Sequence, residues 1–379
     1  MPQKIFNLKF HLLINLIVLV IVTLVFRFTD LDLIISDFWY QRIENWYWAS
    51  TSNTLWGWIY IYGTGPASFV LLAAFVAIVY TLVISHNKLT RMKAICIILA
   101  ILLGPGAIIN GILKPNFGRP RPYAIERYGE SEQFLKILEF GKEGNSFPSG
   151  HASAGFVLTI LFYVFYCHRK KLAWLSLAGS LLLGLILSVA RIAQGGHFAS
   201  DVFWSFSITQ IVNCILYFKL VFPLEYINQK PDTPIENGSI KKKILFYGLS
   251  LVLCLLFIVA FLLNASITKH TRLNEAILPQ TKLLKVNCVL PDEKIVLNYG
   301  RRNHVDFDFL VLANGFSWSE FKLVVDKEES DNHQTTINIR IDKSGMTRDY
   351  NGRIKVMVPK GIKLDLQNVS GKLIENYLD

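Results

Sequence analysis

The stretch from residue 114 to residue 201 decides the fold, because it holds three short polar groups in an otherwise apolar sequence. Charged side chains are costly beside lipid, so a membrane-embedded chain that keeps them must have a use for them. We therefore interpret the rest of the sequence around these groups. They read Lys114-Pro115-Asn116-Phe117-Gly118-Arg119-Pro120-Arg121-Pro122, then Pro148-Ser149-Gly150-His151, then Arg191 with His197 and Asp201.

The composition is that of a membrane protein. Of the 379 residues, 52% are hydrophobic, which is too apolar for an ordinary soluble chain. The net charge of +11 would suit nucleic acid, but Lys and Arg occur in short clusters between apolar runs, the pattern of membrane topology. We therefore predict a membrane partner and no nucleic acid. The five cysteines are scattered and form no disulfide framework or metal motif.

Seven apolar runs predict seven transmembrane helices. The first has basic flanks like a signal peptide but no small-residue cleavage site, so we expect it to be retained. Six of the helices form a core over residues 1–221, a cytoplasmic linker covers 222–243, and the seventh helix covers 244–263. The runs are residues 12–26, 59–84, 94–113, 148–166, 173–190, 202–221 and 244–263.

Basic loops predict the orientation of these helices. With the N-terminus in the cytoplasm, the clusters at residues 88–93, 168–171 and 241–243 all fall on the cytoplasmic side, as the positive-inside rule requires. Residues 114–147 and 191–201 then share the opposite face. We expect a multi-pass protein of a bacterial inner membrane, with the polar groups and the C-terminal domain on the periplasmic side.

The tail from residue 264 to residue 379 has a different pattern. Polar and apolar residues alternate in segments such as 304–311, 335–341 and 362–366, with Gly and Asn turns between them. This predicts a small all-β domain. No group of its side chains suggests catalysis, so we expect it to act as a spacer or to bind an envelope partner. The fold class is thus a mainly α membrane protein with a small C-terminal β domain.

Two of the polar groups suit phosphate chemistry. Ser149 is a good N-cap, and the N–H groups of a first helical turn can bind an anion, although capping alone would also explain the residue. His197 and Asp201 are four residues apart, so on a helix the carboxylate can fix the tautomer of the imidazole and leave its other nitrogen free to attack. A simple capping pair is the alternative. The glycines at 195 and 196 would allow a substrate to approach closely.

The cations Lys114, Arg121 and Arg191 supply what phosphoryl transfer requires, since negative charge spreads over the phosphate oxygens as the reaction proceeds. Each alone could be a residue that snorkels to the interface. Their crowding on the non-cytoplasmic face, beside two histidines, is not explained in that way.

The spacing of all three groups resembles the signature of the type 2 phosphatidic acid phosphatase superfamily, a group of metal-independent lipid phosphatases. Six residues separate Lys114 from Arg121-Pro122, five separate Arg191 from His197, and three separate His197 from Asp201. The resemblance implies His197 as the nucleophile that forms a phosphohistidine, Asp201 as its orienting group and His151 as the general acid. It assigns the phosphate to Lys114, Arg121, Ser149, Gly150 and Arg191, with no metal and no cofactor. One departure is Ala190, where the family usually has Ser.

We expect a phosphatase that hydrolyses a phosphate monoester or pyrophosphate of a lipid, with lipid A favoured. Undecaprenyl pyrophosphate and phosphatidylglycerol phosphate stay open as substrates. A protein that binds or transports an anionic lipid without cleaving it is the second hypothesis. A metallohydrolase that uses His151, His197 and Asp201 as ligands is the third, and it is disfavoured because the surrounding cations would repel a metal.

Overall fold

The structure is a computed structural model, and contacts divide it into two units, Met1–Phe257 and Ile258–Asp379, which are described separately. Half of the predicted linker, residues 228–238, lies outside the described residues. The structure describes residues 7–41, 47–48, 54–128, 132–141, 144–227, 239–263, 265–276, 281–289, 293–300, 304–315, 320–330, 334–344, 347–359, 361–367 and 372–376.

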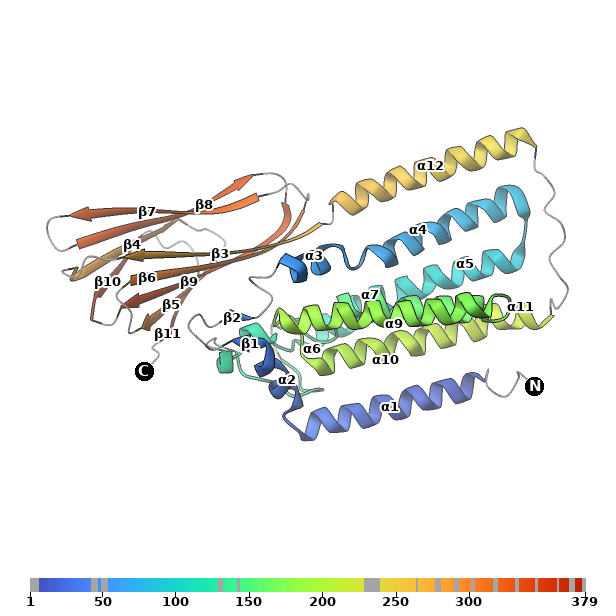
Figure 1. Ribbon diagram of the computed structural model, residues 1–379, viewed down its shortest axis with the longest axis horizontal. Coiled ribbons are helices and arrows are strands. Elements are labelled where there is room, and N and C mark those ends of the chain that lie inside the picture. Colours follow the sequence, from blue (N-terminus) through green and yellow to red (C-terminus); the bar gives the residue numbers. More distant parts are fainter. Residues whose placement is uncertain are drawn as a thin grey trace. The chain divides into compact units, whose positions relative to one another are not determined.

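The first unit is a bundle of helices that run roughly along one another (Figure 1). Its α-helices are α1 (Leu8–Phe28), α2 (Leu31–Trp39), α3 (Thr54–Tyr62), α4 (Gly65–Tyr80), α5 (Lys88–Ile101), α6 (Lys114–Phe117), α7 (Gly150–Phe156), α8 (Ile160–Tyr166), α9 (Lys170–Ala193), α10 (Ala199–Leu216), α11 (Phe222–Ile227) and α12 (Ile240–Leu263). Short π- and 3-10-helical turns and one hairpin join them: η1 (Thr81–Ser85), η2 (Leu102–Leu113), η3 (Pro122–Ala124), η4 (Glu126–Tyr128), η5 (Val157–Thr159), η6 (Tyr217–Val221), β1 (Tyr40–Gln41) and β2 (Tyr47–Trp48).

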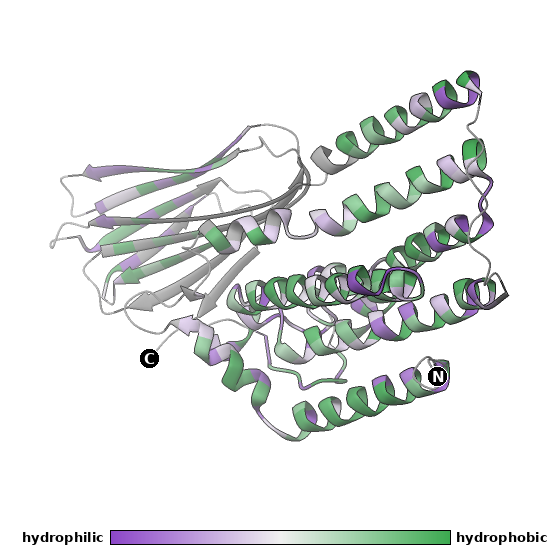
Figure 2. Cartoon of the chain, turned by 45° about the vertical axis from the view of Figure 1, so that its right-hand side comes forward, coloured by the Kyte–Doolittle hydropathy of each residue, from purple (hydrophilic) through white to green (hydrophobic). Residues whose placement is uncertain are grey.

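The predicted membrane fold is confirmed. Within the described residues, six helices are long and apolar enough to cross a membrane, and a shorter apolar helix, Gly150–Tyr166, accounts for the seventh predicted run. Large apolar side chains are exposed along α1, α9 and α12, which suits surfaces that face lipid. Figure 2 shows that hydrophobic residues predominate along the long helices. The six helices are Leu8–Phe28, Trp58–Ser85, Lys88–Ala124, Lys170–Ala193, Ala199–Tyr226 and Ile240–Val259.

Two local features place the polar groups. Pro105 lacks an N–H and sits inside the π-helical segment η2, where Asn110 donates a hydrogen bond of 2.7 Å from Nδ2 to the Pro105 carbonyl. A side chain on Gly155 would lie 2.6 Å from the Cα of Gly184, so these two glycines let α7 and α9 pack closely. The start of α7 and the end of α9 are thereby held near one another.

The second unit consists of two β-sheets, in the strand orders β10-β4-β8-β7 and β11-β5-β9-β6-β3. Their apolar faces share one core of buried side chains, including Phe309 from one sheet and Phe321 from the other. The alternation predicted for 304–311, 335–341 and 362–366 falls on β6, β8 and β10, so the all-β prediction is confirmed. The strands are β3 (Ala265–Ala276), β4 (Leu283–Val289), β5 (Glu293–Gly300), β6 (His304–Gly315), β7 (Glu320–Ser330), β8 (Gln334–Ser344), β9 (Thr347–Pro359), β10 (Lys363–Gln367) and β11 (Lys372–Asn376).

Candidate active site

The three polar groups meet at one end of the helical unit. Lys114 begins α6, Ser149 caps α7 and Arg191 lies in the last turn of α9. His197 lies in the segment just before α10, and Asp201 lies in the first turn of that helix. The backbone ties them together: Tyr123 N donates to Gly195 O at 3.0 Å, and Ser149 N donates to Asp201 O at 3.3 Å. Residues far apart in the sequence therefore form one site.

His197 is buried beside three cations. Burial, followed by the positive charges of Arg191, Lys114 and Arg121, lowers the pKa of His197 well below its usual range. At neutral pH the imidazole is therefore uncharged and keeps a lone pair for attack. His151 also interacts electrostatically with Arg191 and His197, which places both histidines in the same cluster.

Asp201 lies beside His197, as the spacing predicted. Its Oδ2 is 3.6 Å from His197 Nδ1, within ion-pair range but longer than a hydrogen bond. Catalytic contacts of this kind commonly shorten when substrate binds. The same Oδ2 accepts from Ser146 Oγ at 2.5 Å and from Phe198 N at 2.9 Å, so the carboxylate is fixed in place. Because Nδ1 faces Asp201, the free nitrogen of His197 is Nε2.

Arg119 holds the other side of Asp201. Its Nη1 donates to Asp201 Oδ1 at 2.6 Å, and its Nη2 donates to Asp32 Oδ2 at 2.9 Å. The Nε of Arg119 donates to Leu135 O at 2.9 Å, and its Nη1 also donates to Ser200 Oγ at 2.8 Å. The Ser200 hydroxyl in turn donates to Asp32. The guanidinium of Arg119 is buried, where an unpaired charge would be costly, and the carboxylates of Asp32 and Asp201 compensate that charge.

Tyr60 contacts two of the predicted site residues. Its ring stacks on His151, with centroids 4.6 Å apart and 16° between planes, and the Arg191 guanidinium carbon lies 4.5 Å from its centroid. Arg191 also donates to Gln194, while Arg121 Nε donates to Asn145 Oδ1 at 2.7 Å. The ring and these two amides orient the acid and the cations of the site.

The glycines of the site make room for protein groups. A side chain on Gly196 would lie 2.2 Å from Arg191 Nη2, and one on Gly195 would lie 2.3 Å from the Trp48 ring. The Cβ direction of each glycine is thus occupied by a protein side chain, and the close approach of a substrate to these glycines stays a prediction. A side chain on Gly150 would lie 2.6 Å from Asn110 Oδ1, which explains the glycine at the start of α7.

Several residues of this site had no role assigned from the sequence, and three of them contact its central groups: Arg119, Asp32 and Tyr60. Arg119 lies in the first polar group, two residues before Arg121, and position alone does not reveal that the two arginines have different roles. Asp32 could have been suspected, because an acid between Leu31 and Leu33 needs a buried partner. Tyr60 lies on α3 among other aromatic residues, and no sequence signal distinguishes it.

The comparisons with known proteins agree with this geometry. The model of the PAP2 superfamily matches residues 93–224, a segment that contains all eight predicted site residues. This segment belongs to the PAP2 superfamily. The chain therefore carries a PAP2-type phosphatase domain. No solved structure matches the chain.

Three curated relatives are similar to the chain, and each is named lipid A 4'-phosphatase. The protein of Francisella tularensis subsp. novicida is 26% identical over 223 residues, which are 58% of this chain and 99% of the relative. The proteins of Rhizobium etli and Rhizobium leguminosarum are 33% and 32% identical over 107 and 106 residues, about 27% of this chain each. Those matches span 40% and 44% of the two Rhizobium relatives.

Proposed function

We propose that this PAP2-type phosphatase removes a phosphate group from lipid A at the periplasmic face of a bacterial inner membrane. The observation that carries the proposal is the position of His197, which is buried beside Asp201 and a cluster of three cations. The names of the three relatives favour lipid A among phosphorylated lipids.

The first chemical step forms a phosphohistidine. The bound phosphate brings negative charge to the cation cluster, which favours the protonated form of His151. The lone pair of His197 Nε2 attacks phosphorus, the bond from phosphorus to the lipid oxygen breaks, and His151 gives its proton to that oxygen. Lys114, Arg121 and Arg191 neutralise the phosphate oxygens, while Ser149 and Gly150 present the first-turn N–H groups of α7. Asp201 stabilises the charge that His197 gains.

The second step releases phosphate. His151, now neutral, takes a proton from water, the water oxygen attacks phosphorus, and the bond from phosphorus to Nε2 breaks. Inorganic phosphate leaves, and both histidines return to their starting protonation. The chemistry needs no metal ligand, and both oxygens of Asp201 already accept hydrogen bonds from Arg119, Ser146 or the backbone, which argues against a metallohydrolase.

A panel of lipids tests the substrate. Purified protein is mixed with lipid A, undecaprenyl pyrophosphate and phosphatidylglycerol phosphate in the same detergent, and phosphate release is measured. We expect the highest kcat/KM for lipid A. A higher value for either other lipid would transfer the assignment to it, and binding of all three without phosphate release would favour the non-catalytic alternative.

Reporter fusions test the orientation. The proposed division into a core (1–221), a cytoplasmic linker (222–243), a seventh helix (244–263) and a periplasmic β domain (264–379) predicts where each end lies. A phosphatase reporter that is active only in the periplasm should give signal after Leu138 and after Asp379, and none after Lys171. A silent fusion at Asp379 would place the β domain in the cytoplasm, where it could not bind an envelope partner.

A further inference from the structure

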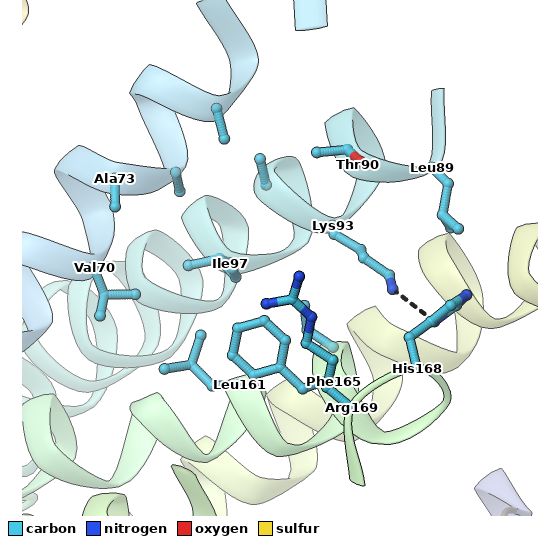
Figure 3. A pocket seen from close by; sticks show the side chains of 14 residues that line it. Val70, Ala73, Leu89, Thr90, Lys93, Ile97, Leu161, Phe165, His168 and Arg169 are labelled. Carbon is cyan, nitrogen blue, oxygen red and sulfur yellow. Dashed lines mark hydrogen bonds between the residues drawn. The ribbon is translucent and has the colours of Figure 1, made fainter. Parts of the chain in front are cut away.

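A cavity lies in the helical unit, away from the candidate active site (Figure 3). It has a volume of about 550 Å³, within the range of about 300–1,000 Å³ that is usual for sites that bury small ligands. Helices α4, α5 and α8 form its walls. None of the eight predicted site residues lines it.

The walls of this cavity are apolar and lined by small residues. Four alanines from α4 and α5 leave the space open, and the larger side chains of Val70, Ile97, Leu161 and Phe165 complete the lining. The four alanines are Ala73, Ala74, Ala77 and Ala94. A largely apolar wall of this kind, in which Thr90 is a polar exception, suits a hydrocarbon chain.

One end of the cavity is cationic. Lys93, His168 and Arg169 lie there, and Lys93 Nζ is 3.4 Å from His168 Nδ1 (Figure 3). Glu225 Oε1 lies 2.6 Å from Lys93 Nζ and compensates its charge, and the same oxygen lies 3.5 Å from His168 Nδ1. Among the residues that the structure describes, no ion pair engages Arg169, so its guanidinium is the uncompensated charge at this end.

The depth of the cationic end matches that of lipid phosphates. Lys93 and Lys114 lie on one continuous helical run, 21 residues apart. At the rise of a helix this separation is about 30 Å, close to the thickness of a hydrocarbon core. Lys114 marks the catalytic end, so Lys93 and Arg169 lie near the opposite interface. Basic pockets between membrane helices bind anionic lipid headgroups at such positions.

We propose that this cavity binds one anionic phospholipid of the bilayer, with its phosphate on Arg169 and an acyl chain between α4, α5 and α8. The charge at the mouth, the apolar walls and the depth in the membrane all agree with this occupant. The placement at the opposite interface rests on the proposed catalytic end, but lipid binding itself does not, because a phosphodiester held there takes no part in phosphate cleavage.

Lipid titrations of the full-length protein test the site. Native mass spectrometry counts bound lipid as phosphatidylglycerol, or phosphatidylcholine with the same chains, is added. Inorganic phosphate is present throughout to occupy the active site. We expect phosphatidylglycerol to bind about fivefold more tightly than phosphatidylcholine, the effect of about one cationic side chain at a membrane surface.

Three variants locate the binding. Arg169→Gln should abolish the preference for phosphatidylglycerol, whereas Lys171→Gln, an equal change of charge on an exposed residue outside the cavity, should retain it. Ala77→Leu should weaken both lipids by filling the cavity. Equal binding of the two lipids to the unmodified protein, or equal effects of Arg169→Gln and Lys171→Gln, would overturn the proposal.

Discussion

The guanidinium of Arg119 lies 2.6 Å from the carboxylate of Asp201, and both side chains are buried. Through this contact the first polar group of the sequence fixes the residue that faces His197. Asp32 on α2 holds the same guanidinium from the other side at 2.9 Å. The N-terminal part of the chain thus takes part in positioning the candidate nucleophile.

Loss of Arg119 should destabilise the protein strongly. Arg119→Met leaves two carboxylates buried without their partner, and we expect a loss of about 3–5 kcal/mol in the free energy of unfolding. Arg127→Gln is the matched control, because it breaks an ion pair with Asp37 that is exposed and contributes about 0–1 kcal/mol. Thermal unfolding in one detergent compares them. Similar unfolding temperatures for the two variants would contradict the buried network.

The ring of Tyr60 should matter more than its hydroxyl. Tyr60→Phe keeps the stacking on His151 and the contact with Arg191, so its kcat/KM should stay within about twofold of the unmodified value. Tyr60→Ala removes both contacts, each of about 1 kcal/mol, and should lower kcat/KM about thirtyfold. Equal losses in the two variants would show that the hydroxyl acts instead.

Replacement of His151 should affect poor leaving groups most. His151→Ala should lower kcat on the lipid phosphate by about 10²–10⁴-fold, because the leaving alkoxide then lacks its proton donor. The loss on p-nitrophenyl phosphate should be much smaller, since nitrophenolate leaves without a proton. The ratio of the two losses is the measurement, and a ratio near one would remove His151 from the acid role.

The acid side of the pH profile should reflect the lowered pKa of His197. Because the folded protein disfavours the imidazolium, the nucleophile stays neutral below its ordinary pKa of about 6.5. We expect kcat/KM for p-nitrophenyl phosphate, corrected for the ionisation of the substrate itself, to decline only below about pH 6.5. A decline centred at or above that value would mean that the cations and the burial do not act on His197.

The helical membrane fold, the β domain and the meeting of the polar groups could be predicted from the sequence. The length of the apolar runs, the alternation of polar and apolar residues and the positions of the basic loops are all properties of short segments. The sequence did not reveal the partners of Asp201. Arg119 and Asp32 are 87 residues apart, and their contact depends on how α2 packs against the site. The stacking of Tyr60 on His151 likewise depends on packing that no local pattern encodes.

Trapping of the intermediate shows whether His197 carries the phosphate during turnover. Protein is mixed with ³²P-labelled lipid phosphate and quenched in alkali within one turnover, and the labelled residue is identified by peptide mapping. We expect an alkali-stable, acid-labile phosphohistidine at position 197 that is absent from His197→Ala. Full turnover by His197→Ala, or label on any other residue of the unmodified protein, would contradict it.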